Sequence, residues 1–272
     1  MNNKTRCKLC ASDDYLIVLD VSDSSDTYLD YLNIEYKTSK RYYKECKKCN
    51  LVYRSVYLDE KEKEKLYSSF RDEDLRNETH KEYFERISKL PKEFSENYEK
   101  YTFLKGFIKK EGIHMDVGGG LGVFSYGFTK FFKKWKSIVV EPTKGAEKIA
   151  NLNGINFYNM YLNEKSISII GNNFDLITVN HVLEHVDDPI SFLKMLSNFL
   201  AQDGFVYIEM PSTKDIDFLP KDHDRFMSQH EVIFNKSSVN LLAAEANYNV
   251  IFNDNFVSKR GRNNVRAILK RI

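Results

Sequence analysis

Residues 113–122, which read I-H-M-D-V-G-G-G-L-G, decide the fold of this chain. Ile113, Met115 and Val117 alternate as in a short buried strand, and the chain then enters a turn that is rich in glycine. Glycine can adopt a positive φ and lets the backbone approach a ligand without a Cβ in the way. Residues 123–132 are apolar and aromatic, which predicts a helix after the turn. Strand, turn and helix in this order predict an α/β sheet that binds a small molecule at the end of its first strand.

The spacing of the glycines narrows the choice of ligand. A P-loop is excluded because no Gly-Lys-Ser/Thr follows, and a nicotinamide fingerprint is incomplete because Val123 stands at its third glycine position. The remaining pattern is Asp116-x-Gly118-x-Gly120-x-Gly122. This pattern resembles the first motif of the class I S-adenosylmethionine (SAM) dependent methyltransferases, with an acidic residue at the end of the strand.

Two later segments extend the resemblance over residues 113–211. The first, S-I-V-V-E at residues 137–141, is a strand pattern that ends in a carboxylate. The second is F-D-L-I-T-V at 174–179, which leads into N-H-V-L-E-H-V-D-D-P at 180–189 and looks like the fourth-strand motif of methyltransferases that modify small molecules and sugars. The resemblance implies a Rossmann-like class I methyltransferase sheet, of the α/β class.

The resemblance also implies which residues bind the cofactor SAM. They are Asp116, Gly118, Gly120, Gly122, Glu141 and Asn180. The glycines would let the backbone lie along the cofactor, and Asp116 would hold the methionine amino group. Glu141 would accept hydrogen bonds from both ribose hydroxyls, and Asn180 would face the methionine end.

Two histidines are candidates for the catalytic base. Residues 229–234 read Q-H-E-V-I-F and resemble the E-H-x-x-x-F motif of zinc-containing sugar C-methyltransferases at His230 and Phe234. Gln229 stands where those enzymes have glutamate, which argues against proton abstraction from carbon and favours an oxygen or nitrogen acceptor. His230 is the first candidate and His181 the second, whereas His185 is expected to be a buried residue that fixes its loop.

The four cysteines form two C-x-x-C pairs: Cys7, Cys10, Cys46 and Cys49. In a reducing compartment, two such pairs predict a tetrahedral, structural Zn²⁺ site rather than disulfides. A chance arrangement and a thioredoxin-like redox pair are the alternatives. Strands expected at 15–21 and 34–43 would make this part a zinc-ribbon-like module.

The chain divides into three predicted parts: a zinc-ribbon-like module at 1–57, a helical connector or lid at 58–112 and the methyltransferase domain at 113–272. Within the connector, four apolar residues recur at helical spacing and predict packing on the sheet: Tyr83, Phe84, Ile87 and Leu90. Tyr67, Phe70 and Arg71 are expected in a lid over the cofactor. Later in the chain, the pattern predicts a helix at 188–201, a turn at 203–204, a strand at 204–210 and a closing antiparallel pair at 248–253 and 264–269.

The composition sets the remaining bounds. A net charge of +2 gives no overall attraction to nucleic acid or to an acidic membrane, and no segment has the pattern of a signal peptide or a membrane span. The chain is therefore expected to be cytoplasmic.

The leading functional hypothesis is methyl transfer from SAM to an oxygen or nitrogen atom of a small polar acceptor. The family resemblance suggests a nucleotide-linked sugar or a precursor of capsule or lipopolysaccharide, and hence a role in polysaccharide biosynthesis. One alternative is an RNA methyltransferase that uses its zinc module to bind RNA, which only the basic segment 259–271 supports. Another is a SAM-binding module without catalytic activity.

Overall fold

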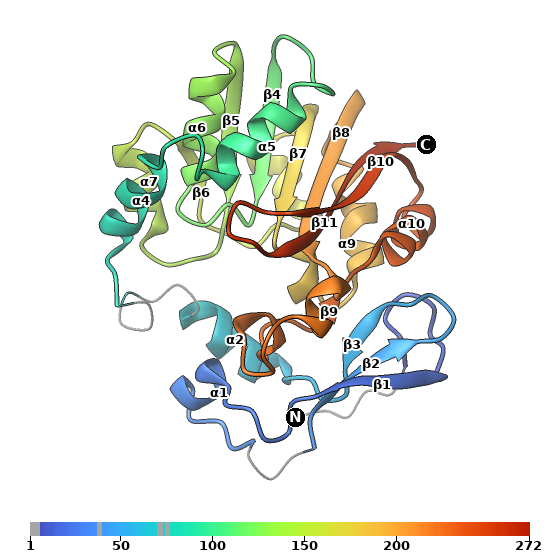
Figure 1. Cartoon of the computed structure of the whole chain (residues 1–272). Helices are drawn as coiled ribbons and strands as arrows, with labels where there is room; N and C mark the ends of the chain where they lie inside the picture. Colours follow the sequence, from blue (N-terminus) through green and yellow to red (C-terminus); the bar gives the residue numbers. More distant parts are fainter. Residues whose placement is uncertain (1–5, 37–39, 70–72, 74–76) are drawn as a thin grey trace.

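A seven-stranded mixed sheet forms the larger part of the molecule, and a small antiparallel sheet lies at one end of it (Figure 1). The computed structural model describes residues 6–36, 40–69, 73 and 77–272. In spatial order, the strands of the large sheet are β10 (Tyr248–Val257), β11 (Asn263–Arg271), β8 (Leu200–Pro211), β7 (Phe174–Asn180), β4 (Gly112–Val117), β5 (Trp135–Val140) and β6 (Asn156–Tyr158). The α/β fold expected from the sequence is confirmed.

The glycine turn follows β4, an inner strand, and so lies at the carboxyl end of the parallel strands, away from the outermost strands. β4 pairs in parallel with β5 on one side and with β7 on the other, while β11 and β10 close the sheet in antiparallel pairing. The chain continues from β4 to β5 on one side, and it later returns from β6 to β7 on the other side of β4. A crevice therefore opens outside the carboxyl ends of these central strands. The loops after β4, β5 and β7 all lie at this end of the sheet.

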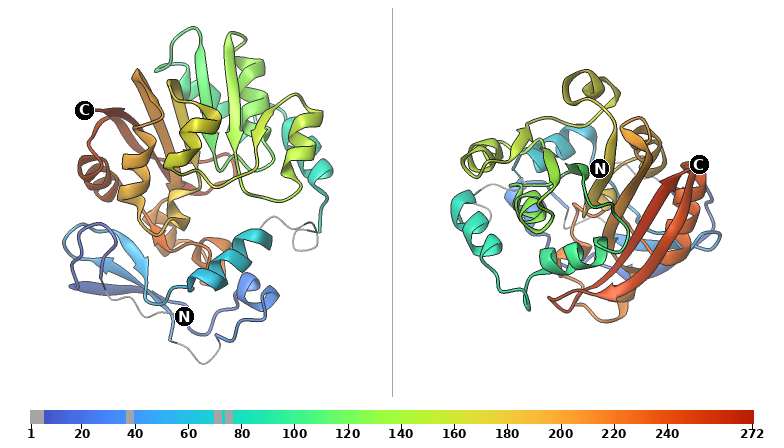
Figure 2. Two further views of the ribbon diagram at one scale, coloured as in Figure 1. Left: turned by 180° about the vertical axis from the view of Figure 1, so that it is seen from behind. Right: turned by 90° about the horizontal axis from the view of Figure 1, so that it is seen from above.

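Helices cover both faces of the large sheet (Figure 2). One face carries α4 (His80–Ser88), α5 (Glu96–Leu104), α6 (Val123–Phe131) and α7 (Ala146–Leu152), and the other carries α8 (Ile167–Ile170), α9 (Pro189–Leu196) and α10 (Lys236–Glu245). The side chains of β4 pack alternately on the two faces of the sheet, because successive side chains of a strand point to opposite faces. Met115 and Val117 belong to the cluster that includes α9 and α10, whereas His114 stacks on Phe128 of α6 at a centroid distance of 4.4 Å.

The connector is helical, as its periodicity predicted. α4 begins with a capping box between Thr79 and Glu82, and its residues Phe84 and Ile87 are buried against the sheet. Before it comes α2 (Glu60–Ser69), and Tyr67 of this helix lines a cavity that is described below. The other two residues expected in a lid, at positions 70 and 71, lie outside the described residues. No helix in the described ranges is long and apolar enough to cross a membrane.

The small sheet combines two distant parts of the chain. Its strands are β1 (Tyr15–Asp20), β2 (Tyr42–Cys46), β3 (Val52–Arg54) and β9 (Val232–Ile233), in this order. The expected strand at 34–43 is wrong in its bounds: β2 begins at Tyr42, and Leu29, Leu32 and Tyr36 instead pack in a cluster around α1 (Thr27–Tyr31). Because β9 pairs with β3, the small sheet joins N-terminal strands to a strand that follows β8 in the chain.

Two boundaries after β7 also differ from the prediction. The helix expected at 188–201 begins correctly, with Asp188 as its N-cap and Pro189 in the first turn, but α9 ends at Leu196. The turn expected at 203–204 lies inside the long strand β8. A Cβ on Gly204 would lie 2.6 Å from the carbonyl oxygen of Phe174 in β7, so this glycine permits close approach of two strands rather than a turn.

Candidate active site

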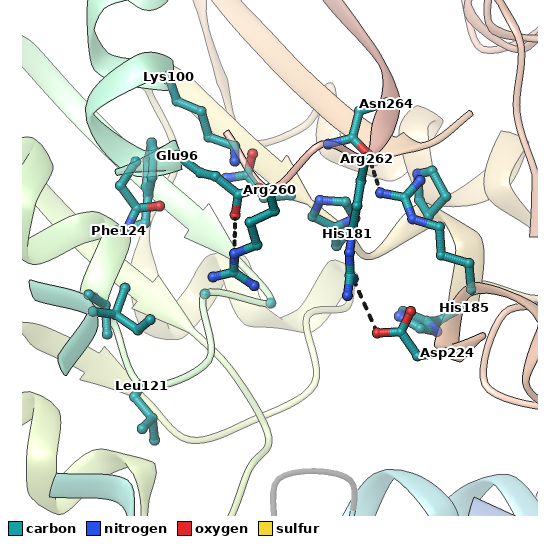
Figure 3. Close-up of a pocket in the computed structure, with 18 of the residues that line it drawn as sticks. Glu96, Lys100, Leu121, Phe124, His181, His185, Asp224, Arg260, Arg262 and Asn264 are labelled. Carbon is teal, nitrogen blue, oxygen red and sulfur yellow. Dashed lines mark hydrogen bonds and ion pairs between the residues drawn. The ribbon is translucent and has the colours of Figure 1, made fainter. Parts of the chain in front are cut away.

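Two cavities open where β4, β5 and β7 end. One has a volume of about 330 Å³ and is lined by residues that follow each strand, Gly118, Glu141 and His181 among them. The other has a volume of about 320 Å³ and extends from the same glycine turn toward the C-terminal hairpin (Figure 3). Gly118, His181 and His185 line both cavities, so the two are neighbours on one continuous wall. We call the first the cofactor cavity and the second the acceptor cavity.

The glycine turn has the conformation that its sequence predicted. Gly118 has a φ of +69°, and a Cβ there would lie 2.4 Å from Cγ2 of Val182. Gly122 has a φ of +76° and is the N-cap residue of α6, without a side chain to cap the helix. Of the three glycines expected to contact the cofactor, Gly118 lines the cavities, Gly120 donates its N–H to Glu141 at 2.9 Å, and Gly122 starts the helix.

Asp116 lies at the end of β4, buried beside the acceptor cavity. Its carboxylate accepts hydrogen bonds from Thr178 at 2.6 Å and from Ser125 at 3.1 Å. Burial raises the pKa of Asp116 to about 7, which the two hydrogen bonds only partly oppose. A cationic ligand group beside this carboxyl would favour its charged form, which fits the expected role of holding the ammonium group of a bound methionine moiety.

Glu141 and Asn180 lie at the ends of the two strands beside β4. Glu141 borders the cofactor cavity, and its carboxylate accepts from the N–H of Gly120 and from the N–H and hydroxyl of Thr143. A carboxylate has about four acceptor positions and these bonds occupy three of them, so one remains for a ribose hydroxyl. Asn180 borders the acceptor cavity, and its buried Oδ1 has no hydrogen-bond partner among the described residues. Such an oxygen is suited to accept from a bound ligand.

His181 is held between two buried carboxylates. Its Nδ1 lies 3.1 Å from Glu184 and its Nε2 lies 3.5 Å from Glu209, while the backbone has a φ of +53°. Burial by itself would lower the pKa of His181, but the hydrogen bonds to these carboxylates outweigh it and raise the pKa to about 9. The ring is therefore charged at pH 7, which suits it to stabilise negative charge and argues against a role as base.

His230 has the opposite character. Burial lowers its pKa to about 3, so the ring is neutral at pH 7. Its Nδ1 donates to the carbonyl of Arg225 at 3.0 Å, which leaves Nε2 as the nitrogen that can accept a proton. The ring lies 4.9 Å from that of His185 and lines the acceptor cavity. The structure thus brings both candidate bases to the same cavity and gives them different charges.

Four lysine and arginine side chains of the described residues line the acceptor cavity: Arg225 and, labelled in Figure 3, Lys100, Arg260 and Arg262. Each forms an ion pair with a carboxylate: Lys100 with Glu209 at 3.1 Å, Arg225 with Asp215 at 2.8 Å, Arg260 with Glu96 at 3.1 Å and Arg262 with Asp224 at 3.1 Å. The side chains of Arg260 and Arg262 are 52% and 34% exposed, so both can also reach a ligand. An arginine has five N–H donors, more than one carboxylate uses.

The sequence model of a family described as "Methyltransferase domain" matches residues 71–252 of the chain. The chain belongs to the SAM-dependent methyltransferases. Two curated relatives agree: an uncharacterized methyltransferase of Schizosaccharomyces pombe, 25% identical over 134 residues, and a ubiquinone biosynthesis O-methyltransferase of Colwellia psychrerythraea, 26% identical over 154 residues. The matched regions are 45% and 48% of this chain, and they span 48% and 62% of the two relatives.

Solved structures of methyltransferases share the fold. A SAM-dependent methyltransferase from Aquifex aeolicus is 19% identical, with a TM-score of 0.51 over 70% of this chain and 99% of that protein. The plantazolicin methyltransferase BpumL, in complex with SAH and a pentazolic desmethylPZN analog, is 17% identical, with a TM-score of 0.56 over 77% of this chain and 96% of that protein.

The methyltransferase also contains the expected four-cysteine cluster. The Sγ atoms of Cys7, Cys10, Cys46 and Cys49 all lie within 4.8 Å of one another, and the two closest pairs are 3.4 and 3.5 Å apart. Thiolates bound to one zinc ion are separated by about 3.8 Å, so these donors fit a tetrahedral Zn²⁺ site. Each pair forms the same turn, in which the residue after the second cysteine, Ala11 or Asn50, has a positive φ and donates its N–H to the carbonyl of the first cysteine.

Sequence reasoning missed most of the acceptor cavity. Lys100 is on α5, Arg225 follows β8, and Arg260 and Arg262 are at the tip of the hairpin between β10 and β11. In the sequence, the basic segment 259–271 is connected only with the RNA alternative. Only the pairing of β11 with β8 brings its tip over the active site of the methyltransferase.

Proposed function

We propose that this methyltransferase transfers the methyl group of SAM to an oxygen or nitrogen atom of a small, polar acceptor that carries negative charge. A nucleotide-linked sugar, such as a precursor of capsule or lipopolysaccharide, has this chemistry. The observation that supports the proposal is the acceptor cavity, in which Arg260 and Arg262 face the same space as Asn180 and His230. Guanidinium groups bind phosphate and carboxylate by paired hydrogen bonds.

The reaction itself asks little of the protein beyond positioning. SAM carries a sulfonium cation, so an acceptor lone pair displaces a neutral thioether in line, and the enzyme holds the two at near-attack distance away from water. Asp116 and Asn180 would hold the methionine end, and Glu141 the ribose. An acceptor hydroxyl also loses a proton, and we assign its acceptance to His230, whose ring is neutral. His181 would stabilise negative charge that develops on the acceptor.

The RNA alternative loses its main support in this geometry. Arg260 and Arg262, two of the six basic residues of the C-terminal segment that favoured it, border a cavity of about 320 Å³. A space of this size admits a small molecule or one nucleotide rather than a folded RNA surface. The cationic side chains are also paired with carboxylates instead of forming an exposed stripe.

An assay for SAH formation tests the proposal. The intact protein and SAM are incubated with nucleotide-linked sugars, with uncharged sugars and with structured RNA. We expect product with an anionic sugar, and Arg262→Gln should raise the KM for this acceptor by about tenfold, from the loss of one charged contact. The affinity for SAM should stay unchanged. Methylation of RNA alone, or of uncharged sugars with equal efficiency, would contradict the proposal.

A further inference from the structure

A second group of metal-ligand type lies outside the cysteine cluster. Glu184, His185 and His230 each offer one ligand atom, and these atoms lie within 4.8 Å of one another. Two segments far apart in the chain supply them, the loop after β7 and the segment before β9. The N–H of Glu231 donates to the carbonyl of Glu184 at 2.8 Å, which ties the two segments together beside the cluster.

A hydrogen bond from Nδ1 to a backbone carbonyl fixes the orientation of both imidazole rings. Nδ1 of His185 donates to the carbonyl of Gln229 at 2.5 Å, and Nδ1 of His230 donates to the carbonyl of Arg225 at 3.0 Å. With Nδ1 as the donor in both rings, Nε2 is the nitrogen that is placed to bind a metal ion. Histidines that bind metals in proteins typically donate their second ring N–H to a backbone carbonyl or a carboxylate, which fixes the tautomer and the ring.

The carboxylate of Glu184 is a second, independent observation that points to a bound ligand. Glu184 has no exposed surface, and its Oε1 pairs with Nδ1 of His181 at 3.1 Å. Its Oε2 is also buried, and it has no hydrogen-bond partner among the described residues. A buried carboxylate oxygen without a partner is unfavourable, and a bound cation would satisfy it.

We propose that Glu184, His185 and His230 bind a divalent transition-metal cation, such as Zn²⁺ or Mn²⁺, that coordinates the acceptor. Two imidazoles and one carboxylate leave coordination positions open for a ligand. His230 lines the acceptor cavity and His185 lines both cavities, so the cation would border the acceptor close to the cofactor. Three ligand atoms on one such ion are about 3–4 Å apart, so binding requires only a small contraction of the cluster.

This inference rests on the proposed function, but it replaces the role of base that was assigned there to His230 with the role of metal ligand. An acceptor hydroxyl oxygen coordinated to the cation becomes more acidic and releases its proton to water in the cavity. An oxygen lone pair then forms the new O–CH₃ bond, and the electrons of the broken C–S bond stay on sulfur, which leaves neutral SAH. In this arrangement, Nε2 of His230 binds the cation and takes up no proton itself.

Titration of the intact protein with Co²⁺ tests the site. Protein with Zn²⁺ in the cysteine cluster is treated with a mild chelator that leaves this zinc in place, and Co²⁺ binding is followed by calorimetry and visible absorption. We expect one further equivalent to bind without the charge-transfer bands of cobalt thiolates. Glu184→Gln should weaken this binding by about tenfold or more. His223→Asn, which changes a histidine of the same segment outside the cluster, should bind like the parent protein.

The outcomes separate this inference from the proposed function. SAM affinity, measured in the same samples, should be the same for the parent protein, for Glu184→Gln and for the chelated protein, which also shows that they are folded. Binding of a second equivalent would support the site even if no anionic acceptor is methylated. The inference fails if the folded protein binds no cobalt outside the cysteine cluster, or if Glu184→Gln binds it as tightly as the parent protein.

Discussion

The two cavities of the active site are built in different ways. The residues of the cofactor cavity come from the ends of neighbouring parallel strands, and Gly118, Glu141 and His181 each follow one strand of the sheet directly. The acceptor cavity combines α5, the loop after β7, the segment before β9 and the tip of the β10–β11 hairpin. A cofactor site formed by a repeated local motif can stay constant while an acceptor site formed by insertions and loops changes with the substrate.

The N-terminal sheet contacts the segment before β9, which lines the acceptor cavity. β9 pairs with β3, the hydroxyl of Tyr43 donates to the carbonyl of His230 at 3.0 Å, and the N–H of Ser228 donates to Asp26 at 2.7 Å. Lys8 and Lys63 also form ion pairs with Glu231. The segment 228–233 is therefore held by the module that contains the four cysteines, so metal binding at one end of the molecule should influence the position of His230.

The variant with the largest expected effect alters the cofactor cavity alone. Gly118→Ala introduces a Cβ that would lie 2.4 Å from Val182 at a φ of +69°, so the turn must shift. The left-handed conformation costs alanine about 1–2 kcal/mol, and the displaced turn should weaken SAM binding, measured by calorimetry, by at least about tenfold. Gly154→Ala is the matched control, because this glycine has a φ of +70° with no atom within 4 Å of the added Cβ. Equal SAM affinity in the two variants would refute the role of the turn.

The second prediction disturbs the acceptor side alone. Cys46→Ser removes one ligand of the cysteine cluster, and loss of a structural zinc site should lower the free energy of unfolding by about 3 kcal/mol or more and turnover by at least about tenfold. The affinity for SAM should change by less than about twofold, because none of the described residues before α2 lines the cofactor cavity.

Zinc removal and readdition in the parent protein provides the control for this second prediction. Chelation should reproduce both losses, and added Zn²⁺ should restore turnover. A parallel loss of SAM affinity would show that the two sides of the active site are not independent.

The third prediction uses pH to separate the two candidate bases. The pKa of His181 is raised in the folded protein from an ordinary 6.5 to about 9, so the charged ring stabilises the fold. This stability is fully present below pH 6.5 and is lost as the pH rises through about 9. His181→Asn suits the left-handed backbone and should lower the free energy of unfolding at pH 6.5 by about 1–2 kcal/mol, after allowance for an exposed fraction of 40%. Denaturant titrations from pH 6 to pH 10 should show the difference shrinking; a constant difference would contradict a charged His181.

The smallest effect concerns the turn of the first cysteine pair. Ala11 has a φ of 55°, a conformation that favours glycine. Ala11→Gly should raise the free energy of unfolding by about 0.5 kcal/mol, because relief of the left-handed strain exceeds the added entropy of the unfolded chain. Ala244→Gly, at an exposed position in α10, should lower it by about 0.5–1 kcal/mol. Denaturant titration distinguishes the two, and a loss of stability in Ala11→Gly would show that the turn does not need glycine-like freedom.

Prediction from the sequence succeeded where a short segment carries its own structural signal. Asp116 lies near the end of β4, Gly118 and Glu141 directly follow β4 and β5, and these strands end side by side because they are parallel. The same reasoning failed at 203–204, where the signal of a turn came from a glycine that allows close packing against β7. It also misplaced β2, because apolar residues before it pack around α1 instead of continuing the strand.

The sequence by itself determined the fold class, the cofactor and the members of the cysteine cluster, since each is marked by short motifs whose residues are close together in the chain. Only the tertiary structure decided that His181 lies between two carboxylates, that His230 is neutral beside His185 and Glu184, and that Arg260 and Arg262 line the same cavity as His230. The physical reason is that charge, burial and ligand geometry depend on side chains that the fold brings together from distant segments. A motif names a residue but not its neighbours.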